Sequence, residues 1–486
     1  MPRLANRHAN VEPVTFGFGG GVNLTRPGED IGFDEMQECI NFEYEQKTGA
    51  LRVRGGTERV FGFPSPVTDL IHTADGNIML ARAGDTIYRL RLNTLTMTDI
   101  GTVEGGKRAS SELWGEDGLV MAFGRRLYLY DGNTLSGPVE SENAPDGVEI
   151  VFVNSGRVAV AGTGSDRLRF SGVGDAECWI EDTDDDSTSR FIEIGYKDGC
   201  GIRAVVPAMG DVLIFKCPEG LPELGRIYRL QGIPGEWAVS EHARGTSAWN
   251  PNSAAVIGND VVFLTREGAA NLAAVTEYGD FKLQWAGAKV NPALAEILSP
   301  ECALRNLAGM GQTWVLDGSP GVWCCFYGVG NAWTALRFPA AVADVIAVGG
   351  EAYLAMGDGI YHMSAAYKTD SGAPKGASLK TGTIMRRNQI LLKRIILKFD
   401  SDAAAEVRLR IEGTAADYLL KRARRERIAA IDEKIAFLDD EPLVFPDAAA
   451  VTRHRCNIRR WEITPEIVVT DGEFRASYFE IEVAEV

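Results

Sequence analysis

An internal repeat is the feature of this sequence that most constrains its fold. The clearest copy consists of Asp75-Gly-Asn-Ile-Met-Leu-Ala-Arg, Ile87-Tyr-Arg-Leu and Asn93-Thr-Leu. About 40 residues later, the same order of turn, apolar strand, Tyr-bearing strand and turn returns as Asp117-Gly-Leu-Val-Met-Ala-Phe-Gly, Leu127-Tyr-Leu-Tyr and Asn133-Thr-Leu. A period of about 40 residues is typical of four-stranded propeller blades, so the repeat predicts a β-propeller.

Weaker copies extend the repeat along the chain. They span Gly156–Phe170, Gly210–Leu230, Asn259–Leu272, Gly311–Phe326 and Gly350–Met363. Together with the two clear copies they give seven turn-plus-strand units between about residues 67 and 367. Their apolar runs are nearly continuous, which is typical of strands buried on both faces. The fold class is therefore predicted to be all-β, with a propeller of about seven blades over residues 67–373. The uneven spacing also fits six or eight blades, and an irregular array of β-sandwiches is the alternative.

Two further segments flank the predicted propeller. Residues 1–66 are predicted to form an N-terminal arm with one or two helical turns at Phe33–Ile40. A hairpin follows, because Asn41–Glu45 and Ala50–Arg54 flank a Thr48-Gly49 turn. Residues 374–486 are predicted to form a β-sandwich-like module. Its expected strands are Ile390–Phe399, Val407–Ile411, Ile458–Ile463 and Tyr478–Val483.

One helix is predicted inside this module, at about residues 414–440. Thr414 can cap it, with Asp417 as the capping-box-like partner. The 3-4-3 spacing of its isoleucines and leucine gives an apolar stripe, and its first half is basic. It is either a solvated helix or a docking helix whose arginines meet an acidic surface, such as another copy of this chain. The candidate interaction residues are Arg422, Arg424, Arg425, Arg427, Ile428, Ile431 and Ile435.

Motifs for catalysis or metal binding are scarce. The five histidines form no His-Glu-x-x-His or His-x-His pair, Gly-x-Ser-x-Gly does not occur, and the eight cysteines form no Cys-x-x-Cys. Asp182, Asp184 and Asp186 alternate as calcium-loop ligands do, but Ser187 stands where such a loop has its glycine. They form either a solvated loop or a weak cation site. The sequence therefore predicts a protein that is not an enzyme and has no cofactor.

The charge and the chain start limit the partners and the compartment. The formal net charge is −17, which argues against a protein that coats nucleic acid, since phosphate binding needs clustered Lys and Arg. The first eight residues show no apolar core of a secretory signal. No apolar run approaches the length of about 18 residues that spans a membrane. We expect folding in a cytoplasm.

A succession of short segments resembles a known family. It runs through Ser171-Gly-Val-Gly-Asp-Ala-Glu-Cys-Trp179, Phe191-Ile-Glu-Ile-Gly195, Gly201-Ile-Arg-Ala-Val-Val, Asp211-Val-Leu-Ile-Phe-Lys216 and Arg226-Ile-Tyr-Arg-Leu-Gln-Gly232. In the arm, Gly20-Gly-Val-Asn, Gln37-Glu-Cys-Ile-Asn-Phe42 and Gly49-Ala-Leu-Arg-Val-Arg-Gly-Gly56 belong to the same pattern. It is similar to the propeller proteins of short-tailed bacteriophage tails, of the nozzle or packaged-DNA-stabilisation type. The helix at about 414–440 stands out as an insertion relative to that pattern.

The resemblance implies a structural virion protein, assembled in the host cytoplasm and located in the tail. It implies a homo-hexameric ring or stopper below the portal and adaptor, through which genomic DNA passes without sequence-specific binding. An acidic wall suits that passage, because it repels the duplex. Two alternatives differ in class. One is a propeller module that binds protein or glycan, and the other is a propeller hydrolase or lyase with Asp184 or Asp186 as the first candidates.

Overall fold

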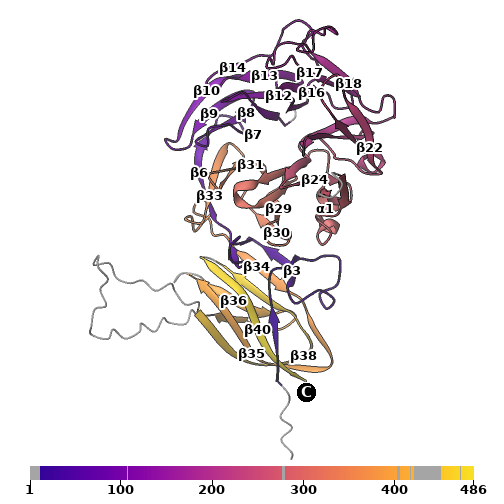
Figure 1. Cartoon of the computed structure of the whole chain (residues 1–486). Helices are drawn as coiled ribbons and strands as arrows, with labels where there is room; N and C mark the ends of the chain where they lie inside the picture. Colours follow the sequence, from indigo (N-terminus) through magenta and orange to yellow (C-terminus); the bar gives the residue numbers. More distant parts are fainter. Residues whose placement is uncertain are drawn as a thin grey trace, which may run out of the picture. The chain divides into compact units, whose positions relative to one another are not determined.

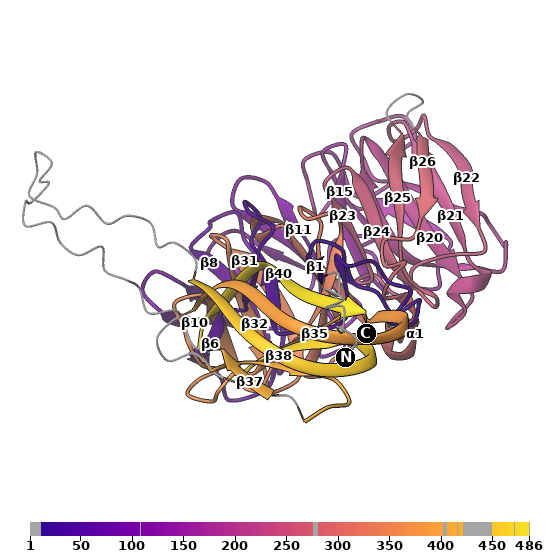
Figure 2. The ribbon, with the colours of Figure 1, turned by 90° about the horizontal axis from the view of Figure 1, so that it is seen from below.

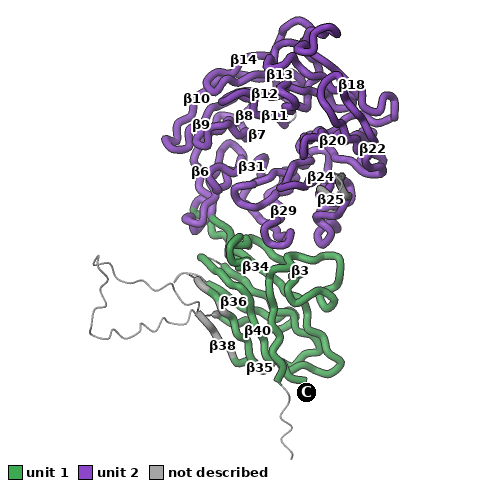
Figure 3. The backbone as a smooth tube through the Cα atoms, in the orientation of Figure 1, with its two compact units in different colours: residues 1–55, 372–486 green, residues 56–371 purple. Residues whose placement is uncertain are grey.

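The computed structural model describes residues 11–106, 108–275, 280–401, 406–415, 417–420, 450–470 and 472–485. Strands make up most of the regular secondary structure of the described chain, which divides into two compact units (Figure 3). One unit is Gly56–Ser371, and the other combines Met1–Gly55 with Gly372–Val486. The prediction of three consecutive segments is therefore corrected. The N-terminal segment belongs with the C-terminal module because its strands share sheets with C-terminal strands.

The Gly56–Ser371 unit is a succession of four-stranded antiparallel sheets (Figure 1). The first two contain β7 (Val67–His72), β8 (Ile78–Ala83), β9 (Thr86–Arg91) and β10 (Thr96–Thr102), then β11 (Ser110–Trp114), β12 (Gly118–Phe123), β13 (Arg126–Tyr130) and β14 (Leu135–Ser136). The next two contain β15 (Ile150–Asn154), β16 (Arg157–Ala161), β17 (Arg167–Phe170) and β18 (Arg190–Glu193), then β19 (Gly201–Ala208), β20 (Asp211–Cys217), β21 (Arg226–Gln231) and β22 (Ala238–Arg244).

The remaining sheets follow the same plan. They contain β23 (Ala254–Ile257), β24 (Asp260–Thr265), β25 (Gly268–Val275) and β26 (Asp280–Gln284), then β27 (Ala303–Leu307), β28 (Gln312–Leu316), β29 (Gly321–Phe326) and β30 (Ala332–Arg337). The last contains β31 (Val342–Val348), β32 (Glu351–Met356), β33 (Gly359–Ser364) and β6 (Gly56–Gly62). Short helical turns are η1 (Pro222–Leu224), α1 (Asn291–Ile297) and η2 (Ala308–Met310).

These sheets form a closed β-propeller. The first strands contact one another in the order β11, β15, β19, β23, β27 and β31, and β31 contacts β7. The ring closes because β6, from the start of the unit, pairs with β33 at its end. The predicted propeller start at residue 67 is therefore corrected to Gly56. The repeat could not show this, since β6 completes a sheet whose other strands lie about 280 residues later in the chain.

The predicted repeat units are the central hairpins of these sheets, formed by the second and third strands. β8 illustrates why their apolar runs are continuous, since all six of its residues are buried. Met79 packs with Ile346 in the cluster against the last sheet. Leu80, on the other face, packs with Met121 of the next sheet. A central strand packs against a neighbouring blade on each face, so both of its faces are buried and its sequence lacks the alternation of polar and apolar residues.

The second unit contains two groups of strands. One has the order β38 (Ala450–Ile463), β35 (Ile384–Ser401), β40 (Phe474–Glu485), β5 (Leu51–Val53) and β4 (Phe42–Tyr44), with β1 (Val11–Phe16) also paired to β40. The other has the order β3 (Glu35–Ile40), β34 (Ala377–Thr381), β39 (Pro465–Val469), β36 (Val407–Ile411) and β37 (Asp417–Leu420), with β2 (Gly21–Val22) beside β3. Figure 2 shows the long strands β35, β38 and β40 side by side.

The predicted hairpin is β4 and β5, and all four predicted C-terminal strands are present. The predicted helical turns at Phe33–Ile40 are wrong, because Glu35–Ile40 is strand β3. A bulge between Met36 and Glu38 shifts the strand by one residue, so Met36 and Cys39 are both buried. Apolar residues three apart then share one face of a strand, which imitates the helical period.

The predicted helix start at Thr414 is also wrong. Thr414 donates its hydroxyl to the Ile411 carbonyl at 2.8 Å in a turn, and Asp417–Leu420 is strand β37. The Asp417 carboxylate pairs with Arg408 of β36 at 3.2 Å rather than capping a helix. Residues 421–449 lie outside the described residues.

None of the eight cysteines forms a disulfide, and six are buried. Burial raises the pKa of Cys302 and of Cys325 to about 12. Thiolate is the reactive form, so buried neutral thiols react slowly. We expect a thiol reagent at neutral pH to label Cys178 of the native protein first and Cys456 more slowly, because burial also raises the Cys456 pKa. Mass spectrometry of labelled peptides measures this order. Prompt labelling of Cys302 or Cys325 without unfolding would contradict it.

Candidate functional site

A repeated polar contact joins the first strands of neighbouring blades. The Asp344 carboxylate on β31 accepts a hydrogen bond from the Leu70 amide on β7 at 3.0 Å. Asp69 on β7 accepts one from the Ala109 amide at 2.6 Å, and the Ser110 hydroxyl on β11 accepts one from the Val151 amide on β15 at 3.0 Å. Buried backbone amides need partners, and these side chains supply them across the gap between sheets. The contact therefore couples the successive blades that begin with β31, β7, β11 and β15.

Asp344 is the centre of the charged group with the most ion pairs among these contacts. Its side chain is 1 % exposed and pairs with Arg305 of β27 at 2.7 Å and with Arg108 at 3.2 Å. Arg305 also donates to the Asn252 side chain at 2.9 Å. Burial alone would raise the pKa of Asp344, but the charges of both arginines and the donated hydrogen bonds hold it below its usual value. Asp344 thus stays ionised and links β31 to β7, to β27 and to the segment before β11.

Asp69 has the same role one blade further on. It pairs with Arg82 of β8 at 2.7 Å, and both side chains are at most 4 % exposed. Ionised carboxylates make stronger hydrogen bonds than neutral acceptors do, so Asp69 and Asp344 suit positions that hold an amide and a guanidinium together. This network is structural chemistry: its carboxylates are engaged by protein donors on both oxygens.

Lys216 of β20 forms a second buried charged group. Its side chain is fully buried, and its Nζ lies 2.8 Å from Asp166 and 3.0 Å from Asp198. The Nζ also donates to the Ile194 carbonyl at 2.6 Å. Asp198 accepts a further hydrogen bond from the Tyr228 hydroxyl at 2.8 Å. The ammonium thus fastens the loops on either side of the β17–β18 hairpin to β20.

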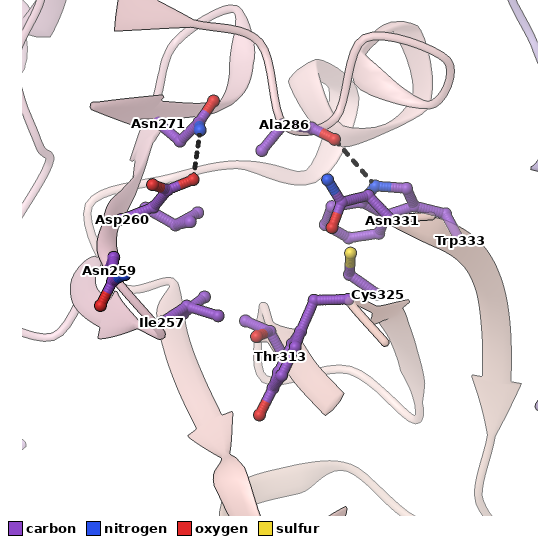
Figure 4. A pocket seen from close by; sticks show the side chains of 11 residues that line it. Ile257, Asn259, Asp260, Asn271, Ala286, Thr313, Cys325, Asn331 and Trp333 are labelled. Carbon is purple, nitrogen blue, oxygen red and sulfur yellow. Dashed lines mark hydrogen bonds between the residues drawn. The ribbon is translucent and has the colours of Figure 1, made fainter. Parts of the chain in front are cut away.

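A pocket of about 250 Å³, here called the side pocket, lies between the β23–β26 and β27–β30 sheets (Figure 4). Asp260 and Asn271 line one side, and the Asn271 amide donates to the Asp260 carboxylate at 3.1 Å. Trp333 lines the other side and donates its indole N–H to the Ala286 carbonyl at 3.1 Å. The hydroxyl oxygen of Thr313, a residue that is 2 % exposed, is buried in the same lining with no hydrogen-bond partner. The side chains of this lining can bind a small polar molecule.

The aspartates predicted as a weak cation site lie in a loop between β17 and β18. The Asp182 carboxylate accepts the Asp184 amide at 2.9 Å, and Asp186 pairs with Arg190 at 3.2 Å. Glu193 stands at the twelfth position counted from Asp182, where a calcium loop has its bidentate glutamate. Its carboxylate pairs with Arg167 at 2.9 Å. The carboxylates of Asp182 and Asp186 are thus engaged in a turn and an ion pair. Among the described residues no group of three or more His, Cys, Asp or Glu side chains could hold a metal ion.

The other predicted site residues are those of the basic helix, Arg422, Arg424, Arg425, Arg427, Ile428, Ile431 and Ile435, and all of them lie outside the described residues. No helix in the described part of the chain is long and apolar enough to cross a membrane.

The Asp–Arg network was not predicted from the sequence, although the sequence holds a signal for it. Val67-Thr-Asp-Leu-Ile71 and Val342-Ala-Asp-Val-Ile346 share the order Val, any residue, Asp, apolar, Ile. Both segments are first strands of a blade, ahead of the repeat units that were compared. The side pocket has no such signal, because its residues come from six separate stretches spread over about 75 positions.

Comparisons of the sequence with family models and with curated proteins find no match. Solved structures similar to the fold include Chaetomium thermophilum Raptor, at 11 % identity and a TM-score of 0.43, covering 67 % of this chain and 30 % of that one. The extracellular domain of a hybrid two component system from B. thetaiotaomicron is similar at 11 % identity and a TM-score of 0.45, covering 78 % of this chain and 56 % of that one. The RRP9 WD40 repeats are similar at 9 % identity and a TM-score of 0.40, covering 64 % of this chain and 98 % of that one. The chain thus spans about a third of the length of the Raptor chain and about half of the length of the two component system domain. The propeller fold itself rests on the strand pairing.

Proposed function

We propose that this chain is a structural protein of a bacteriophage tail, without enzymatic activity. In this proposal it forms a homo-hexameric ring or stopper below the portal and adaptor, through which genomic DNA leaves. The Gly56–Ser371 unit is a seven-bladed propeller, and the other unit is a β-sandwich to which both ends of the chain contribute. The main support is the structural position of the sequence segments that resemble tail propeller proteins.

Those residues hold the N-terminal segment to the C-terminal module. Gln37 donates its amide to the Thr381 carbonyl at 2.8 Å, and Asn41 donates to the Gly376 carbonyl at 2.6 Å. Arg54 is fully buried and donates to the Asn41 side chain at 3.1 Å. The shared pattern therefore marks a way of building the second unit, in which the chain returns after the propeller to complete sheets begun before it. That architecture is what the resemblance carries to this chain.

The propeller part of the pattern is structural too. Trp179 is fully buried and donates its indole N–H to the Ala176 carbonyl at 3.0 Å. Ser171 accepts the Val158 amide at 3.0 Å. At Gly56, an added Cβ would collide with the carbonyl oxygens of Tyr367 and Thr369, so only glycine fits. The net charge of −17 is in keeping with a passage that DNA does not adhere to.

Assembly with the head–tail connector tests this function. We expect the full chain, mixed with the portal–adaptor complex encoded near its gene, to form a six-fold ring on the adaptor in electron micrographs. Light scattering should show that the portal–adaptor complex gains a mass consistent with six copies of the 52.7 kDa chain. A chain that stays monomeric and never joins the adaptor would count decisively against the proposal. Bovine serum albumin, another acidic protein, serves as the control for charge-driven adhesion.

A further inference from the structure

We propose that the side pocket binds the ring of one neutral sugar. This inference does not rest on the proposed tail function, because it concerns the lining of a pocket inside the propeller. The pocket holds about 250 Å³ and is lined by Ile257, Asn259, Asp260, Val262, Asn271, Ala286, Thr313, Cys325, Tyr327, Asn331 and Trp333. Pockets for drug-sized ligands begin at about 300 Å³, so this one suits a single small ring.

The polar groups of the pocket match hydroxyl groups. Asn259 and Asn331 are exposed at its rim, and Asn271 is buried deeper beside Asp260 (Figure 4). Each carboxamide both donates and accepts hydrogen bonds, as each sugar hydroxyl does. Asp260 is an acceptor whose carboxylate is already oriented by Asn271 at 3.1 Å. Several hydroxyls on one ring can therefore pair with these groups at once.

Thr313 gives the clearest indication that a ligand belongs here. Its Oγ1 is buried and has no hydrogen-bond partner, while the residue is 2 % exposed. A buried polar atom without a partner costs stability, so natural structures seldom keep one without a reason. Thr313 lies in the same lining as Asp260 and Trp333. A ligand hydroxyl would supply the missing partner.

The apolar part of the lining suits the C–H groups of a sugar. The indole N–H of Trp333 is occupied by the Ala286 carbonyl at 3.1 Å, so the ring offers only its π surface and edge to a ligand. Ile257, Val262 and Ala286 extend this apolar area. A pocket with carboxamides on one side and an aromatic ring on the other matches a molecule with hydroxyls around an apolar ring face.

Charge and hydrogen-bond chemistry disfavour the two main competing ligand classes. The eleven lining residues include one carboxylate and neither Lys nor Arg, so no cationic side chain of the lining would attract a phosphate or a sugar acid. An ammonium ion needs acceptors alone, and it would leave the donor groups of the rim carboxamides unused. A neutral sugar satisfies donors and acceptors together.

Ligand-observed NMR on the full chain tests the site. The probes are glucose, galactose, mannose, N-acetylglucosamine and rhamnose, with inorganic phosphate and choline as the competing classes. We expect at least one sugar to bind and phosphate and choline to give no signal. Thr313→Val keeps the side-chain shape and should weaken sugar binding about tenfold, since one hydrogen bond is lost. Asp260→Asn should weaken it by a similar factor.

The controls separate binding from folding. Thr313→Val removes an unsatisfied hydroxyl, so the thermal unfolding temperature of the sugar-free protein should stay the same or rise. Asp146→Asn is the matched control for Asp260→Asn, because it makes the same chemical change at a side chain that is 90 % exposed and lies outside the pocket. It should leave sugar binding unchanged. The proposal is overturned if no sugar binds, if phosphate or choline binds better, or if Thr313→Val and Asp260→Asn both bind sugar as the wild type does.

Discussion

Asp344→Asn is expected to lower the free energy of unfolding of the propeller by about 3–5 kcal/mol. The substitution keeps the shape of the side chain but removes the charge that faces Arg305 at 2.7 Å and Arg108 at 3.2 Å. Both guanidinium groups are mostly buried and would lose their nearest counter-charge, which is expensive for buried charges. The asparagine amide would also meet donors where the carboxylate now accepts hydrogen bonds from Leu70 and Val345.

Urea unfolding followed by tryptophan fluorescence measures this loss. Asp358→Asn is the matched control, because Asp358 also pairs with an arginine, Arg59, at 3.1 Å. Both partners of that pair are exposed, at 61 % and 42 %, and exposed pairs contribute about 0–1 kcal/mol. If the Asp344 and Asp358 variants lost equal amounts of stability, the buried network would not be what couples the blades.

Lys216→Met is expected to cost about 3 kcal/mol of stability. Methionine fills most of the space of the lysine stem but removes the ammonium that pairs with Asp166 and Asp198. Asp198 is 8 % exposed and would keep its hydrogen bonds from the Cys200 amide and the Tyr228 hydroxyl. Lys380→Met is the control, since Lys380 pairs with Glu412 at 2.6 Å at a partly exposed site. A loss as small as that of the control would show that Lys216 is dispensable.

The Lys216 variant should also change how stability depends on pH. Burial would raise the pKa of Asp198, but hydrogen bonds from Cys200, Lys216 and Tyr228 and the charge of Lys216 lower it overall. A carboxyl with a lowered folded-state pKa stabilises the fold above its unfolded-state pKa, near 3.9, and loses that contribution as the pH falls through the folded-state value. We therefore expect wild-type stability to decrease more steeply below about pH 4 than that of Lys216→Met. Parallel curves would contradict this.

Local sequence predicted the strands of this protein well where both faces of a strand are buried. The repeat units at Asp75 and Asp117 became central hairpins because their apolar runs and turns are sufficient signals by themselves. Prediction failed where a bulge changed the side-chain period, as at Met36 and Cys39. It also failed at Thr414, whose capping pattern is satisfied equally by a turn that leads into a strand.

The candidate sites were less predictable than the strands. Asp344 contacts Leu70 across a separation of 274 residues, and Thr313 and Asp260 line one pocket only because two blades pack together. The charges and hydroxyls themselves carry no mark of their partners, since a buried polar side chain and an exposed one can follow the same apolar neighbours. Only the Val-x-Asp-apolar-Ile pattern shared by Asp69 and Asp344 gave a usable trace.

By itself the sequence determined the repeating strand–turn unit, because turn chemistry and apolar periodicity act between residues close in the chain. The tertiary structure alone decided how the ring closes through β6, which carboxylates tie the blades together, and that the N-terminal segment shares sheets with the C-terminal module. The physical reason is distance along the chain: β6 and β33 are about 300 residues apart and meet only because the intervening sheets bring them together. No local pattern specifies such a contact before the fold exists.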